Sequence, residues 1–145
     1  MSELKPLRLI ANSDEDLPAI SAALQDAVCQ IGDLQYQASA GQFTLALNRF
    51  CWEAGEDGKG FRVRTGVQVG AVERAQSQNL KAGATDAVIS VLSIQFEAGD
   101  APSGALVFTF SGGGLLRLEV ECLDIALADV SEPWRAIARP DHSIA

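Results

Sequence analysis

A short run at residues 48–53 concentrates the side chains best suited to hold a small ligand. The indole of Trp52 offers a flat apolar wall, and the planar fork of the Arg49 guanidinium can bind an anionic group through two hydrogen bonds. Glu53 or Asn48 would then fix the orientation of that ligand. These four residues form a candidate ligand site beside a glycine-rich, charged stretch at 54–60, which we expect to be a surface loop.

The same run has a structural interpretation, which we favour. Arg49 and Glu53 can form an ion pair on the surface, a kind of pair that stabilises a fold by less than about 1 kcal/mol. Phe50 and Trp52 would then cover the core. Covalent catalysis by the neighbouring Cys51 is disfavoured, because no histidine lies near it in the sequence to act as a base.

The cysteines and the histidine predict neither a disulfide nor a metal centre. Cys29, Cys51 and Cys122 are far apart, and each lies in an apolar segment, so we expect reduced thiols within the core. The single histidine, His142, lies near the C-terminus, which leaves a Cys/His zinc site short of ligands. We expect no metal and no cofactor.

Two further motifs have a possible chemical use, and each has a simpler explanation. Glu119 and Glu121 lie two residues apart on one strand face, a spacing that suits an acid–base pair or a divalent cation. Solvated carboxylates that face Arg62 and Arg64 from another strand are the favoured alternative. Residues 111–114, Ser-Gly-Gly-Gly, are expected to form a turn, because a strand follows them where a phosphate loop would lead into a helix.

The charge of the chain points to a protein partner and away from nucleic acid. Eleven basic and nineteen acidic residues give a net charge of −8, which repels phosphate backbones. The acidity is concentrated between residues 86 and 132. We therefore expect any protein partner to meet the strand faces around Glu119, Glu121 and Asp124.

Length and composition predict one folded domain over residues 1–145, with 138–145 as a loose tail. Apolar residues make up 48% and charged residues 21%, the balance of an ordinary globular protein. No stretch approaches the ~18 consecutive apolar residues of a membrane span, and the first residues do not resemble a secretory signal. We expect a cytoplasmic protein.

Apolar spacing predicts one helix, from Asp14 or Asp16 to near Ile31, with Gly32 as its C-terminal stop. Residues with helical spacing along it are Leu17, Ile20, Leu24, Ala27 and Val28. The stretch 73–83 is polar and is expected to be a connection.

Alternation of apolar and polar residues predicts most of the strands, and β-branched content predicts the one at 87–96. They are expected at 7–10, 34–36, 43–47, 61–71, 87–96, 106–110, 116–122 and 123–127. The apolar phase flips at Leu123, which requires a bulge or a sharp bend. Pro133 and Trp134 should end the ordered part. The predicted class is α+β, with the N-terminal helix packed on a strongly bent, mostly antiparallel sheet of about seven or eight strands, as in a small or pleckstrin-homology-like barrel.

Long runs of the chain resemble a bacterial domain-of-unknown-function family found in alphaproteobacteria. They include ISAALQDAVCQIGDLQY, LNRFCWE, DAVISVLSIQF and GALVFTFSGGGLLRLEVECLDIALADV, and the similarity spans roughly residues 7 to 134. The resemblance implies a stand-alone cytoplasmic protein with no assigned activity. The residues themselves favour a non-catalytic binding or regulatory module that interacts with a protein partner. The alternative is a small-anion binder or an enzyme that uses a pocket near Arg49, Trp52 and Glu53.

Overall fold

The described part of the chain forms one antiparallel sheet of eleven strands and one α-helix. In this computed structural model the described residues are 6–51, 60–81 and 83–135. The strands are β1 (Arg8–Ala11), β2 (Val28–Gln30), β3 (Leu34–Gln37), β4 (Gln42–Phe50), β5 (Phe61–Val69), β6 (Val72–Gln78), β7 (Val88–Ala98), β8 (Gly104–Phe110), β9 (Leu115–Val120), β10 (Ile125–Asp129) and β11 (Trp134–Arg135). The helix is α1 (Leu17–Leu24), and short 3-10 turns are η1 (Asp14–Asp16), η2 (Ile31–Asp33), η3 (Ala38–Ala40) and η5 (Ser111–Gly113).

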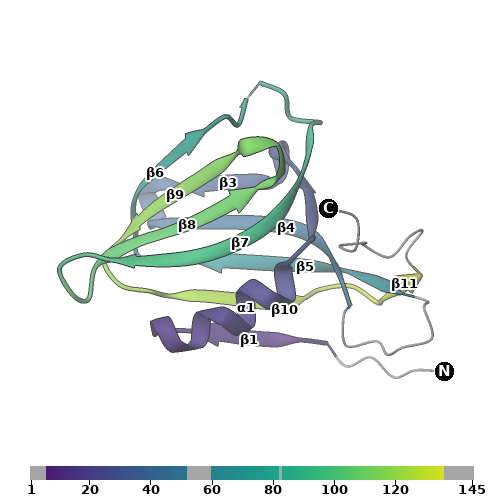
Figure 1. The fold of residues 1–145 in the computed structure, drawn as a ribbon, viewed down its shortest axis with the longest axis horizontal. Helices are drawn as coiled ribbons and strands as arrows, with labels where there is room; N and C mark the ends of the chain where they lie inside the picture. The colour runs from purple at the N-terminus through teal and green to yellow at the C-terminus, as the bar shows by residue number, and fades with distance from the viewer. Residues whose placement is uncertain (1–5, 52–59, 82, 136–145) are drawn as a thin grey trace.

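The sheet folds over on itself without closing (Figure 1). Its strand order is β1-β10-β5-β4-β2-β7-β8-β9-β6, with β3 also paired to β4 and β11 to β5. The three residues of β2 pair with β4 on one side and β7 on the other, so they join the two halves. The α+β class is confirmed. The prediction of a small or pleckstrin-homology-like barrel with seven or eight strands is wrong, because β2, β6 and β11 add three strands and the two end strands stay unpaired with each other.

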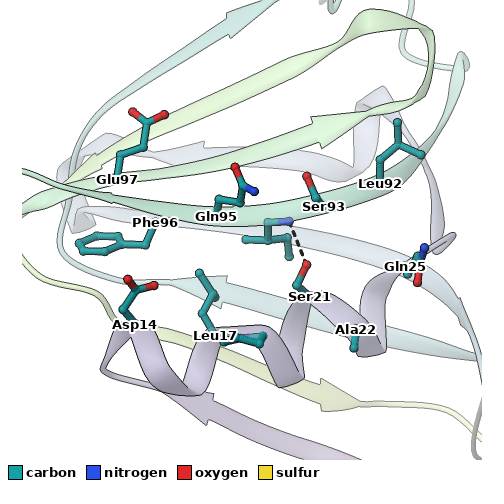
Figure 2. A pocket seen from close by; sticks show the side chains of 12 residues that line it. Asp14, Leu17, Ser21, Ala22, Gln25, Leu92, Ser93, Gln95, Phe96 and Glu97 are labelled. Atoms are coloured by element: carbon teal, nitrogen blue, oxygen red, sulfur yellow. Dashed lines mark hydrogen bonds between the residues drawn. The ribbon is translucent and has the colours of Figure 1, made fainter.

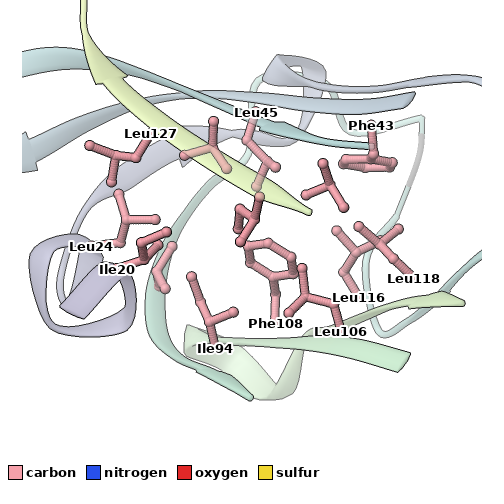
Figure 3. Close-up of a cluster of buried hydrophobic side chains, with 14 of the residues drawn as sticks. Ile20, Leu24, Phe43, Leu45, Ile94, Leu106, Phe108, Leu116, Leu118 and Leu127 are labelled. Carbon is pink, nitrogen blue, oxygen red and sulfur yellow. The ribbon is translucent and has the colours of Figure 1, made fainter. Parts of the chain in front are cut away.

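Apolar side chains from the two halves face each other and form the core (Figure 3). Alternate residues of a strand point to one face of a sheet, so each long strand contributes every second residue. Phe43 and Leu45 of β4 lie on one side, and Leu106, Phe108 and Leu118 lie on the other. This inward row confirms the alternation predicted for β4, β8 and β9.

The helix covers one open side of the folded sheet, between β7 and β1 (Figure 1). Leu17, Ile20 and Leu24 are buried, which confirms the predicted apolar face of the helix. The predicted end near Ile31 is wrong: the helix ends at Leu24, and Asp26 adopts a positive φ of 67°. After Ala27 the chain continues as β2, in which Cys29 is buried. The apolar spacing of these residues allows burial in a strand as well as in a helix. At eight residues, α1 is too short to cross a membrane, and no other helix among the described residues is long and apolar enough.

Two segments predicted as connections or chain ends are strands. Residues 73–78 of the predicted polar connection belong to β6, an edge strand paired with β9. Trp134 and Arg135 pair with the start of β5, so the ordered part continues past Pro133. The predicted tail at 138–145 lies outside the described residues. β6 has a small and a polar residue, Ala75 and Ser77, at inward positions, which explains why it escaped the search for apolar alternation.

The phase flip predicted at Leu123 is a sharp corner of the chain. β9 ends at Val120, and β10 begins at Ile125 in the other half of the sheet. The Gly70 amide donates to the Asp124 carbonyl, 2.9 Å away, which fixes the corner to the end of β5. The 111–114 turn is confirmed as the link of the β8–β9 hairpin, with Gly112 at a φ of 76° that favours glycine.

Candidate functional site

The predicted ligand residues of β4 point to opposite faces of the sheet. Asn48 lies on the outer face, where its side-chain oxygen accepts a hydrogen bond from Arg64 Nη1 at 3.1 Å. Arg49 follows the inward parity of Leu47 and has only 1% of its surface exposed. Trp52 and Glu53 lie outside the described residues. The structure therefore does not bring Asn48 and Arg49 into one pocket, and a small-anion site around these four residues stays a prediction.

Arg49 forms a buried ion pair with Asp129 of β10, so the expectation of an arginine in a surface pair is wrong. Its Nε donates to Asp129 Oδ1 at 2.9 Å, and its Nη2 donates to Oδ2 at 2.8 Å. The Thr65 hydroxyl and the Leu7 amide donate to the same carboxylate, at 2.9 and 2.7 Å. The Asp129 side chain is 3% exposed. A carboxylate with four short donors already has its hydrogen-bonding capacity filled by the protein.

The partners of Asp129 lower the pKa of its carboxyl group below the ordinary value. Burial acts in the opposite direction, because it disfavours the charged form. Hydrogen bonds from Arg49, from the Leu7 amide and from Thr65, together with the positive charge of Arg49, outweigh it. Asp129 is thus held as a carboxylate, and this cluster ties β1, β4, β5 and β10 together.

The predicted acidic partner residues fall into two places. Glu119 lies on the outer face of β9, directly opposite Arg74 of β6, so the expectation that it faces Arg62 and Arg64 is wrong. Glu121 and Asp124 are exposed in the corner between β9 and β10. Within the described residues, no three Asp, Glu, His or Cys side chains group closely enough to hold a metal ion.

All three cysteines are free thiols, and two of them are buried as predicted. Cys29 and Cys51 are 4% and 3% exposed, whereas Cys122 is only partly buried. Burial, with a smaller contribution from the charge of Asp33, raises the pKa of the Cys29 thiol to about 12. Cys29 is therefore protonated at neutral pH and is a poor nucleophile.

A groove of about 600 Å³, which the sequence did not reveal, lies between α1 and β7 (Figure 2). β7 pairs with β2 through residues 88–90 and with β8 through residues 91–98. From Leu92 onward, its second edge has no strand neighbour among the described residues and faces α1 instead. The Ser21 hydroxyl of α1 accepts the Ile94 amide at 3.1 Å, so the helix occupies one position of that edge.

The remaining backbone groups of this edge are available to a ligand. Residues two apart on a strand direct their amides and carbonyls to the same side. The backbone amide and carbonyl of Phe96 therefore point toward the groove, as those of Ile94 do. Outside the β7–β8 ladder, no hydrogen bond within the described part of the chain takes the Phe96 amide. The register of β7 shifts at Leu92, and the apolar parity shifts there too, from Ile89 and Val91 to Ile94 and Phe96. That change of parity was the sequence signal for the bulge that shapes the groove.

The groove carries acidic side chains at one end and none at the other, where Gln25 and Leu92 lie. Asp14 and Glu97 lie at one end, on either side of the Phe96 ring, while the half-exposed Leu92 lies near the other (Figure 2). Glu97 also accepts a hydrogen bond from Arg117 on the outer face, at 2.6 Å. Of the described residues that line the groove, none is Lys or Arg. An extended chain with an apolar and a basic side chain fits this distribution.

Comparison with known proteins assigns the family. A model described as a protein of unknown function, DUF2948, matches residues 7–142, nearly the whole chain. The chain belongs to this family. Family membership confirms the predicted resemblance to an uncharacterised domain, and the family description gives no activity or partner. No curated protein matches the chain, and no solved structure matches it.

Proposed function

We propose that the domain is a non-catalytic binding module that takes an extended, basic segment of a protein partner into the groove between α1 and β7. The observation that carries the proposal is the unpaired edge of β7 beneath the helix. An extended peptide can add a strand to such an edge, with affinity from main-chain hydrogen bonds and specificity from alternate side chains. The apolar wall at Leu92 and the acid at Asp14 offer separate contacts for two such side chains.

The acidic end of the molecule supports a basic partner. The start of α1, the β7–β8 turn and the β9–β10 corner gather at the left end of Figure 1. These segments carry Asp14, Asp100, Glu121 and Asp124. Glu119 lies on the outer face of β9, in register with Ala105, which is itself opposite Glu97. Negative potential at this end speeds the encounter with a basic segment and makes the association sensitive to salt.

We further propose that this binding takes place in the bacterial cytoplasm. The resemblance to alphaproteobacterial chains supports a bacterial source. Three cysteines without a disulfide suit a reducing compartment.

Selection of peptides from a random twelve-residue phage library tests the proposal, followed by affinity measurement with labelled synthetic copies. We expect selected peptides to carry Lys or Arg and to lose binding when alternate amides are N-methylated, because strand addition uses those amides. Ala22→Trp should fill the groove and abolish binding, whereas Ala19→Trp, also exposed on α1 but outside the groove, should leave it unchanged.

A second pair of variants tests whether the negative charge of the groove contributes to peptide binding. Asp14→Lys should weaken binding several-fold, and Asp86→Lys, the same charge change at an exposed position outside the groove, should not. Selected peptides that bind Ala22→Trp as tightly as the unmodified protein would overturn the proposed site. A library that yields no binding peptide would overturn the proposed function.

A further inference from the structure

A second hollow lies where the sheet fails to close, between the free edges of β3 and β6. Within the described part of the chain, β3 pairs with β4 alone, and β6 pairs with β9 alone. The two edges approach at one end, where the Val72 amide at the start of β6 donates to the Gly41 carbonyl after η3, 2.8 Å away. Beyond that bond they separate and leave a cavity of about 370 Å³. This volume falls within the range of small-molecule sites.

The cavity reaches the core of the molecule. Its floor is formed by Phe43 and Leu116, which are 5% and 3% exposed and lie at the same end of the core (Figure 3). Four partly buried hydrophobic residues form its walls. They are Ile31, Leu34, Ala75 and Leu80. Half of the eight partly buried hydrophobic residues that pack against the core therefore surround this one cavity, an unusual concentration of accessible apolar surface.

Small inward-facing residues of β6 keep the cavity open. Ala75 lies opposite Leu118 and Ser77 lies opposite Leu116, so both share the inward parity of the core. Ser77 is nevertheless exposed, because its side chain faces the hollow, and no hydrogen bond within the described residues involves its hydroxyl. That hydroxyl can donate to a ligand or accept from it.

The far wall is fixed in place by backbone hydrogen bonds. The Gly32 amide of η2 donates to the Thr85 carbonyl at 3.0 Å, and the Ile31 amide donates to the Ala87 carbonyl at 2.9 Å. A Cβ at position 32 would lie only 3.2 Å from the Thr85 carbonyl oxygen, so glycine lets the two segments approach closely. The cavity is therefore formed before a ligand arrives, which lowers the entropic cost of binding.

We propose that this cavity binds a small, uncharged, largely apolar molecule that has one hydrogen-bonding group, which meets the Ser77 hydroxyl. The described lining contains no charged side chain, so an ionised group would lose its hydration without gaining an ionic partner. The site is separate from the groove between α1 and β7, since the two share no lining residue.

A matched pair of probes tests the chemistry of the ligand. Indole-3-acetamide and indole-3-acetate differ by one charge and little in shape, and amide NMR spectra of the labelled protein report where each binds. We expect the acetamide to shift the signals of Ser77, Leu34 and Leu80, and the acetate to bind at least tenfold more weakly. Equal affinity for the two probes would overturn the proposal that the ligand is uncharged. An absence of shifts around the cavity with either probe would overturn the proposal that the cavity is a binding site.

A matched pair of variants tests the location. Ser77→Phe places a ring in the cavity from an exposed position, so the fold should tolerate it, and it should weaken binding of the acetamide at least tenfold. Gln78→Phe adds the same ring at the next position of β6, outside the cavity lining, and should leave the affinity unchanged. A folded Ser77→Phe protein that keeps the original affinity would contradict the proposal. Both variants should bind groove peptides normally.

Discussion

Replacement of Arg49 by methionine tests whether the Arg49–Asp129 ion pair contributes to stability as a buried pair or as a surface pair. The substitution removes two hydrogen bonds and the positive charge from Asp129, whose side chain stays buried with the Thr65 hydroxyl and the Leu7 amide as its remaining donors. Loss of one partner from a buried pair costs about 3–5 kcal/mol. At an unfolding entropy of ~2.1 cal/mol/K per residue, this lowers the Tm of a 145-residue chain by about 10–16 °C.

The pH dependence provides a second measure of the same pair. In the unmodified protein the folded-state pKa of Asp129 lies below its unfolded value, so the stabilisation is present above about pH 4 and is lost as the pH falls through the folded pKa. In Arg49→Met, Asp129 loses the charge and the hydrogen bonds of Arg49, and only the Leu7 amide and the Thr65 hydroxyl still oppose the effect of its burial. The folded-state pKa of Asp129 is therefore higher in the variant than in the unmodified protein. The difference in stability between the two proteins should therefore shrink as the pH falls.

Urea unfolding followed by circular dichroism, repeated from pH 7 to pH 4, measures both effects. Arg117→Met is the matched control, because Arg117 pairs with Glu97 at 45% and 59% exposure and should cost less than about 1 kcal/mol. The double variant Arg49→Met/Asp129→Leu removes both charges and should recover most of the stability. A loss below about 1 kcal/mol for Arg49→Met at pH 7, or a loss independent of pH, would refute the reasoning.

Two further predictions follow from the thiols and from one glycine. Mass spectrometry after brief iodoacetamide treatment should find Cys122 modified first and Cys29 last, because burial raises the pKa of the Cys29 thiol to about 12; early modification of Cys29 would contradict its burial. Gly104→Ala should lower the free energy of unfolding by more than about 1 kcal/mol, because a Cβ there would lie 2.5 Å from the Glu97 carbonyl oxygen. A Cβ at position 83 meets nothing within 4 Å, so Gly83→Ala should stay within about 0.5 kcal/mol of the unmodified protein. Urea unfolding measures both variants, and equal losses in the two would count against the clash.

The sequence predicted the strands that alternate clearly and failed where alternation is weak. β4, β8 and β9 bury alternate residues under a facing layer, and their apolar periodicity is visible without a structure. β6 carries small or polar residues at its inward positions 75 and 77, because it borders the cavity and not the core. Ala27 and Val28 match both a helical and an extended pattern, and the burial of β2 between two strands decides between them.

The error over Arg49 has a different origin. Its parity with Phe43, Leu45 and Leu47 predicts an inward side chain, and Asp129 has the same relation to Ile125 and Leu127. Charge made both residues look exposed. Their pairing depends on β4 and β10 both lying beside β5, a neighbourhood set by the complete topology and not by local sequence. The groove and the cavity depend on the same long-range arrangement, so no local pattern could locate them.

The position of β10 determines when the domain can assemble during synthesis. β10 lies between β1 and β5, although it is almost the last strand to be made. Until residues 125–129 leave the ribosome, both neighbouring edges lack a partner, and the apolar faces of β4 and β5 stay accessible to other chains. Most of the strand contacts join distant residues, which slows folding in general. A nascent chain stalled before β10 is therefore the species most exposed to aggregation, and chaperones should engage it there.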